Sequence, residues 1–194
     1  REKAPYLSSR DMYLDEKGEV IEDLSSLGHL AAGVPGSVAG MLYVLEKYGT
    51  MNREDVLSYA IELAEKGFPM EKELARGLKN HRVEFSRFEG SRQLFDNDWE
   101  KGDIFVQPDL ANTLKEISKF GRDGFYKGKI ADLIIDEMKR GNGIISYKDL
   151  EDYNVIERPA LYGNYRGFDI ISMPPPSSGG ICLIYLLNIL EQYD

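Results

Sequence analysis

Apolar residues recur at helical spacing in four long segments of this 194-residue chain, and a glycine directly follows each of them. Side chains three or four positions apart share one face of a helix, and a glycine just past the last apolar residue is a common helix end. The pattern therefore predicts helices over residues 35–48, 52–66, 109–120 and 125–140. Shorter helices are expected over 70–80 and from Ser146 to about Tyr153, which makes 35–153 a helix-rich region.

Residue types within these segments also predict helix starts and a buried face. Asn52 with Asp55, and Ser146 with Asp149, have the spacing of a capping box, and Asp109 is expected to cap the helix that follows it. The apolar stripes predict that the following side chains face a core: Val38, Met41, Leu42, Leu45, Val56, Ala60, Leu63, Ala64, Leu74, Leu78, Ile130, Leu133, Ile134 and Met138.

The hydrophobic period changes after Pro159. Apolar and polar residues then alternate in two short runs, and Arg166-Gly167 lies between the runs. Alternation around a two-residue turn is typical of a β-hairpin, which we expect over 161–173. The three prolines that follow are expected to be extended, because proline fixes its own φ and restricts the residue before it.

The end of the chain is expected to be a helix over 179–192, capped by one of the two serines at 177–178. Residues 82–108 lack a clean period and are expected to be irregular, with one short helix. The sequence thus predicts an α+β chain that is mostly helical, a single partial domain over 1–194 with a hairpin and proline corner at 161–180.

Charge excludes several classes of function. The chain has 33 acidic and 24 basic residues and a formal charge of −9, which disfavours nucleic acid and anionic membranes as partners. Its longest apolar run, 181–187, is far shorter than the ~20 residues of a membrane span. Cys182, the only cysteine, lies in this run and is expected to be an inert core thiol. Because the chain starts at Arg1 without an initiator methionine, we interpret it as a piece of a longer or processed protein.

Residue spacing alone offers little catalytic or metal chemistry. His29 and His81 form no H-x-x-x-H pair, and each is expected to be an ordinary hydrogen-bonded histidine. Asp96, Asp98 and Asp103 resemble a calcium loop, but the glycine and glutamate that an EF-hand needs at its sixth and twelfth positions are missing. We therefore expect no metal site and no cofactor.

Two segments have a possible binding role. The Pro-Pro-Pro-Ser-Ser-Gly-Gly run at 174–180 could present free N–H groups to an anion, but a rigid strand-to-helix corner is the favoured interpretation. The chain opens with Arg-Glu-Lys-Ala-Pro, and an arginine can hold a carboxylate through two hydrogen bonds. Composition alone favours a solvated terminus there.

Six motifs nevertheless occur in a fixed order along the whole chain. They are R-E-K-A-P, G-V-P-G-S-V-A-G, Y-G-T-M, G-F-Y-K-G, G-I-I-S-Y-K-D-L, and Y-R-G leading into S-M-P-P-P-S-S-G-G, at residues 1–5, 33–40, 48–51, 124–128, 143–150 and 165–180. In this order they resemble the large subunit of the γ-glutamyltranspeptidases, also called glutathione hydrolases.

The resemblance implies an N-terminal-nucleophile hydrolase with a four-layer αββα core in the complete enzyme. A precursor of this family cleaves itself into a large and a small subunit. The new N-terminal threonine of the small subunit attacks a γ-glutamyl amide such as glutathione, and water or an amine resolves the acyl-enzyme. The implied partner is therefore this small subunit, and the implied location is the periplasm or the exterior of the cell.

Only the substrate clamp of that site is implied within this chain. Arg1 matches the family arginine that pairs with the α-carboxylate of the γ-glutamyl group, and Glu2 matches the glutamate beside it. Thr50 and Thr113 do not match the nucleophile, so the chain has no expected catalytic residue and should be inactive in isolation. It is expected to expose an apolar face where the small subunit packs.

Two alternatives to a γ-glutamyltransferase stay open. One is a related N-terminal-nucleophile enzyme, either a poly-γ-glutamate-processing member or a cephalosporin acylase-like member. The other is a non-catalytic binding module derived from the family.

Overall fold

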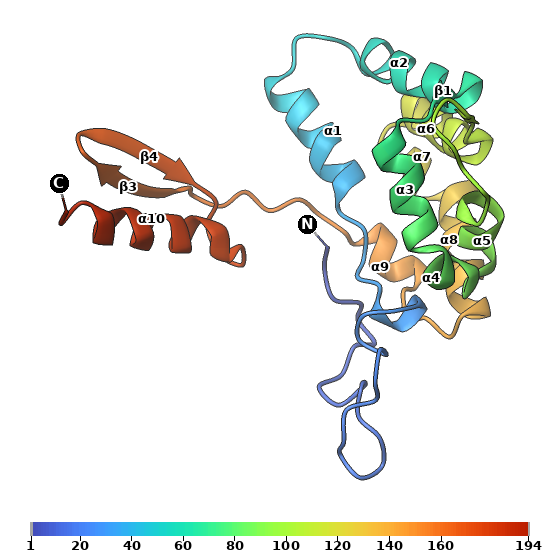
Figure 1. The fold of residues 1–194 in the computed structure, drawn as a ribbon, viewed down its shortest axis with the longest axis horizontal. Coiled ribbons are helices and arrows are strands. Elements are labelled where there is room, and N and C mark those ends of the chain that lie inside the picture. Colours follow the sequence, from blue (N-terminus) through green and yellow to red (C-terminus); the bar gives the residue numbers. More distant parts are fainter. Residues whose placement is uncertain (1, 194) are drawn as a thin grey trace. The chain divides into compact units, whose positions relative to one another are not determined.

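A computed structural model describes residues 2–193 (Figure 1). The contacts within the chain form two compact units, one ending at Val155 and the other beginning at Ile156. About half of the described residues lie in α-helices, and the strands are few and short, so the prediction of a largely helical α+β chain is confirmed. The single partial domain predicted for 1–194 stays a prediction.

The first unit consists of helices and one two-stranded ribbon. A 3₁₀ helix, η1, precedes the α-helices, and the strands pair antiparallel, with Phe68 opposite Phe105. In chain order the elements are η1 (His29–Ala31), α1 (Ser37–Tyr48), α2 (Arg53–Lys66), β1 (Phe68–Pro69), α3 (Lys72–Asn80), α4 (Arg82–Ser86), α5 (Glu89–Phe95), β2 (Ile104–Phe105), α6 (Pro108–Phe120), α7 (Asp123–Tyr126), α8 (Gly128–Arg140) and α9 (Tyr147–Glu151).

Two of the three helix caps predicted in this unit are confirmed and one is wrong. Asn52 caps α2 by accepting a hydrogen bond from the backbone N–H of Asp55 at 2.8 Å, and the capping box at the start of α9 is also confirmed. The predicted cap at Asp109 is wrong, because α6 begins one residue earlier, at Pro108. Proline suits the first turn of a helix, where its missing N–H leaves no hydrogen bond unmade.

Two other helix predictions are wrong in their bounds. The single helix expected over 125–140 is two helices, α7 and α8, because Lys127 is extended and Gly128 has a φ of 59°, a left-handed conformation that glycine adopts without a steric cost. The segment 82–108, expected to contain one short helix, contains α4, α5 and the strand β2.

The main core of the first unit joins α1, α7, α8 and α9. Its buried side chains are Val34, Ala39, Tyr126, Ala131, Ile135, Ile145, Leu150 and Tyr153. A second cluster lies under the β1–β2 ribbon and consists of Met70, Ala75, Leu78 and Phe105, with Phe68, Phe85, Leu94, Phe95 and Trp99 packed around it. The helices of this unit therefore pack on one another through these two clusters, and not on a large sheet.

The inward faces predicted from the stripes are only partly correct. Leu42, Ala64, Leu78 and Ile130 are buried, whereas the predicted core positions Met41, Val56, Ala60, Leu63, Leu74 and Leu133 are exposed. On α2 the inward face is shifted by one position, since Leu57 and Ile61 are half-buried while Val56 and Ala60 are not. A stripe predicts which face is apolar, but the element packed against it decides which residues are covered.

The second unit contains a hairpin and a helix. Strands β3 (Leu161–Tyr165) and β4 (Phe168–Ser172) pair antiparallel, with Leu161 opposite Ser172. Arg166 and Gly167 form the turn with φ values of 50° and 83°, as a two-residue hairpin turn requires. Helix α10 (Ser178–Leu190) packs on β3 at Gly163, where an added Cβ would lie 3.1 Å from Ile184 Cγ1. The predicted hairpin is confirmed.

Two predictions for this unit are wrong. The prolines 174–176 are not simply extended: Pro175-Pro176 is a cis peptide, and the Ser177 N–H donates to the Pro174 carbonyl at 3.3 Å across a turn. Cys182 is exposed rather than a core thiol, because α10 is apolar on all sides and the hairpin covers only one of them. Within residues 2–193, no helix combines the length and the apolar character that a bilayer crossing needs.

Candidate functional site

The segment that follows Arg1 is held against the second sequence motif. Arg1 itself lies outside the described residues. The Lys3 N–H donates to the Val34 carbonyl at 3.2 Å, and the Val34 N–H donates back to the Lys3 carbonyl at 2.8 Å. Glu2 is exposed, and its Cβ would lie only 3.1 Å from a Cβ added at Gly33. The structure thus brings the 1–5 and 33–40 motifs side by side, and Gly33 leaves room for Glu2.

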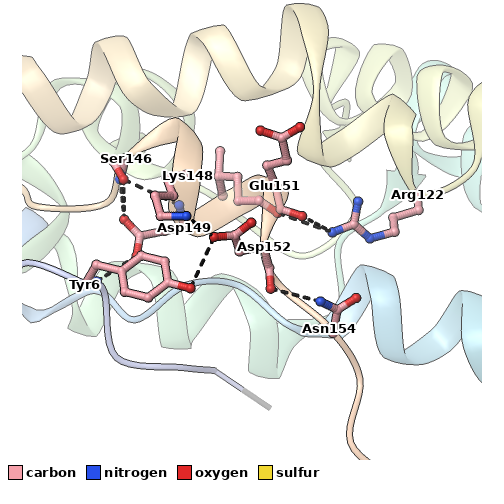
Figure 2. A network of polar contacts seen from close by, with 9 residues as sticks. Tyr6, Arg122, Ser146, Lys148, Asp149, Glu151, Asp152 and Asn154 are labelled. Atoms are coloured by element: carbon pink, nitrogen blue, oxygen red, sulfur yellow. Dashed lines mark hydrogen bonds and ion pairs between the residues drawn. The ribbon is translucent and has the colours of Figure 1, made fainter.

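A buried carboxylate joins the fifth motif to the same segment (Figure 2). Asp149 is 3% exposed and accepts hydrogen bonds with both oxygens. Its Oδ2 accepts from the Ser146 N–H at 2.8 Å and from the Ser146 hydroxyl at 2.5 Å, which completes the capping box of α9. Its Oδ1 accepts from the Tyr6 N–H at 2.7 Å. Two segments 143 residues apart are therefore joined by one side chain.

The Tyr6 ring has further contacts on the surface (Figure 2). Its hydroxyl donates to Asp152 Oδ2 at 3.2 Å, and Lys148 Nζ donates to the same oxygen at 2.6 Å. The ammonium groups of Lys3 and Lys148 lie 4.7 and 5.2 Å from the centre of the ring. These groups are exposed, so each contact contributes little to the free energy of unfolding.

Tyr126, in the fourth motif, connects the second motif to the core. Its side chain is buried, and its hydroxyl donates to the Pro35 carbonyl at 2.7 Å and accepts from the Ala39 N–H at 3.3 Å. The N-cap of α1 is Gly36, which has no side chain to pair with the free N–H groups of the first turn. A distant tyrosine therefore caps this helix in place of a local side chain.

Arg122 binds the end of α9, beside the Asp149 site (Figure 2). Its Nη2 donates to the carbonyls of Leu150, Glu151 and Tyr153, at 3.4, 2.8 and 2.7 Å. Its guanidinium lies 4.8 Å from the centre of the Tyr126 ring, which in turn stacks on Tyr153 at 5.7 Å. One cation thus satisfies several carbonyls at a helix end, where backbone acceptors have no partner in the helix.

The electrostatics of the site favour an ionised Asp149. Burial acts against the charged form, but the hydrogen bonds from Ser146 and the Tyr6 N–H outweigh it and hold the pKa of Asp149 below its ordinary value. The hydrogen bond from Lys148 similarly lowers the pKa of Asp152. Burial raises the pKa of Tyr126, so its hydroxyl stays a donor at neutral pH.

The remaining candidates from the sequence have structural partners. His29 Nε2 lies 2.5 Å from Glu137 Oε1, and His81 Nδ1 lies 4.0 Å from Glu84 Oε2. Arg82 pairs with both Asp96 and Asp98, and Asp103 accepts from the Glu100 N–H at 2.8 Å. Over residues 2–193, no group of three or more His, Cys, Asp or Glu side chains has an arrangement that could hold a metal ion.

The proline motif has a packing role. An added Cβ at Gly180 would collide with the Met173 carbonyl, so this glycine lets the first turn of α10 approach the end of the hairpin. Ser177 is the N-cap residue but makes no side-chain capping bond. These contacts support the interpretation of 174–180 as a strand-to-helix corner.

Neither threonine resembles an activated nucleophile. The Thr113 hydroxyl donates to the Asp109 carbonyl at 2.9 Å within α6, and Thr50 lies in the exposed connection after α1. The sequence contains recognisable motifs, but it did not indicate that Tyr6, Arg122 and Tyr126 are the residues that join them. Tyr126 lies inside a motif and Tyr6 directly follows one, yet nothing in their spacing indicates a partner.

Solved structures with the same fold identify the fold class of this chain. Helicobacter pylori gamma-glutamyltranspeptidase is 47% identical, with a TM-score of 0.98 over 100% of this chain and 57% of that chain. A cephalosporin acylase from Bacillus halodurans is 22% identical, with a TM-score of 0.83 over 100% of this chain and 37% of that one, and this likeness is one of fold alone. The chain therefore has the fold of a helix-rich portion of an N-terminal-nucleophile hydrolase.

Comparison of sequences defines the family. The gamma-glutamyltranspeptidase family model matches residues 1–194, and the chain belongs to this family. A curated relative, the glutathione hydrolase proenzyme of Pseudomonas sp. (strain A14), is 45% identical over 197 residues, which cover 100% of this chain and 34% of the relative. The chain thus spans about a third of the length of the curated relatives that it matches.

Proposed function

We propose that the complete protein cleaves γ-glutamyl amides such as glutathione and transfers the γ-glutamyl group to water or to an amino-acid or peptide acceptor. Membership of the family and the name of its relative, a glutathione hydrolase proenzyme, support this activity. The observation that carries the proposal is the pairing of Lys3 with Val34, which places Glu2 on Gly33 and so unites the two motifs around the expected clamp.

The proposed contribution of this chain is to bind the α-carboxylate of the donor. A guanidinium at Arg1 would form two parallel hydrogen bonds with that carboxylate, and Glu2 would support the same pocket. Because the α-carboxylate is held, the γ-carbonyl at the other end of the donor is positioned next to the nucleophile. Part of the binding energy is thus used to orient the reacting groups. Arg1 and Glu2 are thus proposed substrate-binding residues, and the catalytic groups are proposed to lie outside this chain.

The proposed nucleophile is the N-terminal threonine of a small subunit. Its hydroxyl oxygen would attack the γ-carbonyl carbon while its own α-amino group takes the proton, and the C–N bond of the amide would break as the amine leaves with that proton. Water or an acceptor amine would then attack the ester and release the threonine. The relative's name as a proenzyme and its greater length support such a partner, as do the exposed apolar side chains of α10 such as Leu183 and Leu186.

Turnover of a γ-glutamyl anilide by the complete, processed protein tests this proposal. We expect release of the aniline, faster when a dipeptide acceptor is added, because a transferase resolves its acyl-enzyme with an amine. The matched control is an acyl anilide without the α-carboxylate, which should be a poor donor. Preference for that control would favour the acylase-like alternative, and binding of glutathione without turnover would favour a non-catalytic module.

A periplasmic or secreted location is proposed from the family resemblance alone. Cell fractionation with an antibody to this chain tests it against a cytoplasmic marker enzyme. Recovery of the protein with the cytoplasmic marker would contradict the proposal.

A further inference from the structure

We infer that Asp149 is a positioning residue for the proposed substrate clamp, because its carboxylate holds the segment that carries Arg1 and Glu2 through the N–H of Tyr6. The inference rests on the proposed function, since it assigns Asp149 a role in binding the donor. Asp149 does not touch the donor in this account. It acts through the backbone of another segment.

The two oxygens of Asp149 have separate tasks. Oδ2 accepts both hydrogen bonds from Ser146 and completes the capping box, which needs nothing more from this side chain. Oδ1 accepts from the Tyr6 N–H, at 2.7 Å. An aspartate at this position therefore does more than cap α9, since its second oxygen holds a segment 143 residues away.

The anchored segment has one fixed point on each side of Pro5. On one side, the Lys3–Val34 pair provides two backbone hydrogen bonds. On the other side lies the Tyr6–Asp149 bond, and the Pro5 side chain between them is buried. Glu2 is one residue from the first point. Releasing the second point would remove one of these two backbone constraints on the segment that follows Glu2.

Charge strengthens this anchor. Hydrogen bonds that an ionised carboxylate accepts are stronger than those between neutral groups, and Asp149 is 3% exposed, so water competes little for it. The nearby charged groups are Lys3, Lys148 and Asp152, of which Lys3 favours the ionised form of Asp149. The ring of Tyr6 is half exposed, whereas its N–H is directed at the buried oxygen.

A pair of substitutions at Tyr6 isolates the N–H from the ring. The Ser8 N–H donates to the Pro5 carbonyl at 3.0 Å, so Tyr6 is the second residue of a turn, a position that proline favours. Tyr6→Pro removes the N–H together with the ring, and Tyr6→Ala removes the ring alone. In the complete protein we expect Tyr6→Pro to raise KM for a γ-glutamyl anilide about tenfold or more above Tyr6→Ala, with kcat within about twofold.

A second pair of variants tests the carboxylate. Asp149→Asn leaves one acceptor oxygen for three donors, whereas Ser146→Ala removes one donor to Oδ2 and keeps the Tyr6 bond. We expect Asp149→Asn, but not Ser146→Ala, to raise KM about tenfold and to speed hydrogen exchange at the Tyr6 amide. A residue that only caps α9 would affect both variants alike and would leave that amide protected.

The outcomes separate the inference from the function on which it rests. An active wild-type enzyme in which Tyr6→Pro matches Tyr6→Ala in KM overturns the inference and leaves the proposed function intact. Equal KM effects of Asp149→Asn and Ser146→Ala also overturn it. A wild-type protein without activity on γ-glutamyl donors refutes the proposed function, and the inference with it.

Discussion

Replacing Tyr126 by phenylalanine tests the cap that this residue provides to α1. The substitution keeps the buried ring and its stacking on Tyr153, and removes only the hydroxyl. The Pro35 carbonyl then loses a donor at 2.7 Å, and the Ala39 N–H loses its acceptor at 3.3 Å. A buried group left without its partner costs about 1–3 kcal/mol. For the two groups together we expect the first turn of α1 to be destabilised by about 2–4 kcal/mol.

Hydrogen exchange of the complete protein measures this loss locally. A cost of about 2–4 kcal/mol corresponds to roughly 30- to 900-fold faster exchange of the first α1 amides, if they exchange through local opening. Tyr147→Phe is the matched control, since that hydroxyl donates to Asp132 at an exposed site and its loss should change exchange by about twofold. Unchanged protection of α1 in Tyr126→Phe would refute the capping role.

Three further predictions concern packing, pH and the isolated chain. Gly141→Ala places a Cβ against the His29 ring and should destabilise the protein by about 1–3 kcal/mol in thermal melts, whereas Gly77→Ala, in open space within α3, should stabilise it by up to about 1 kcal/mol. The hydrogen bonds to Asp149, and to Glu137 from His29, lower both carboxyl pKa values, so their stabilisation is complete above about pH 4–5 and falls as the pH drops through the folded pKa values. Melting temperatures that stay constant from pH 6 to about pH 2.5 would contradict this. The isolated 194-residue chain should release no aniline from a γ-glutamyl anilide, and turnover above background would contradict the proposal that the nucleophile lies outside this chain.

Local signals predicted the helices well where they act within a few residues. Asn52 and Ser146 cap their helices as their spacing indicates, and a glycine follows α1, α2, α6 and α8 at the predicted stops. The hairpin turn at Arg166-Gly167 is equally local. These features depend on backbone geometry and on side chains that reach only their neighbours, and a sequence encodes both directly.

Features that depend on contacts with distant residues could not be predicted from local sequence. Apolar spacing on α2 indicated Val56 and Ala60 as the inward positions, but the packed residues are Leu57 and Ile61, because α6 covers a different part of that face. Cys182 was expected in a core, yet the hairpin leaves its side of α10 uncovered. Whether a side chain is buried depends on its own helix and on the element that packs against it, and the sequence of one helix describes only the first of these.

The candidate site shows the same limit. The motifs indicated Arg1 and Glu2, and the capping spacing indicated Asp149 as part of a helix start. The bond that Asp149 Oδ1 accepts from a backbone N–H 143 residues earlier leaves no trace in spacing, because any residue except proline supplies the donor. The same holds for the three hydrogen bonds that Arg122 donates to the carbonyls of Leu150, Glu151 and Tyr153.

The central claim is that this chain holds the α-carboxylate of a γ-glutamyl donor at Arg1. The most direct measurement compares kcat/KM of the complete protein and of its Arg1→Ala variant on a γ-glutamyl anilide and on the analogue without the α-carboxylate. Loss of such a charge pair costs about 2–5 kcal/mol, so kcat/KM for the carboxylate donor should fall by roughly 30- to 5000-fold while that for the analogue changes little. An equal fall on both donors, or no fall on either, would contradict the claim.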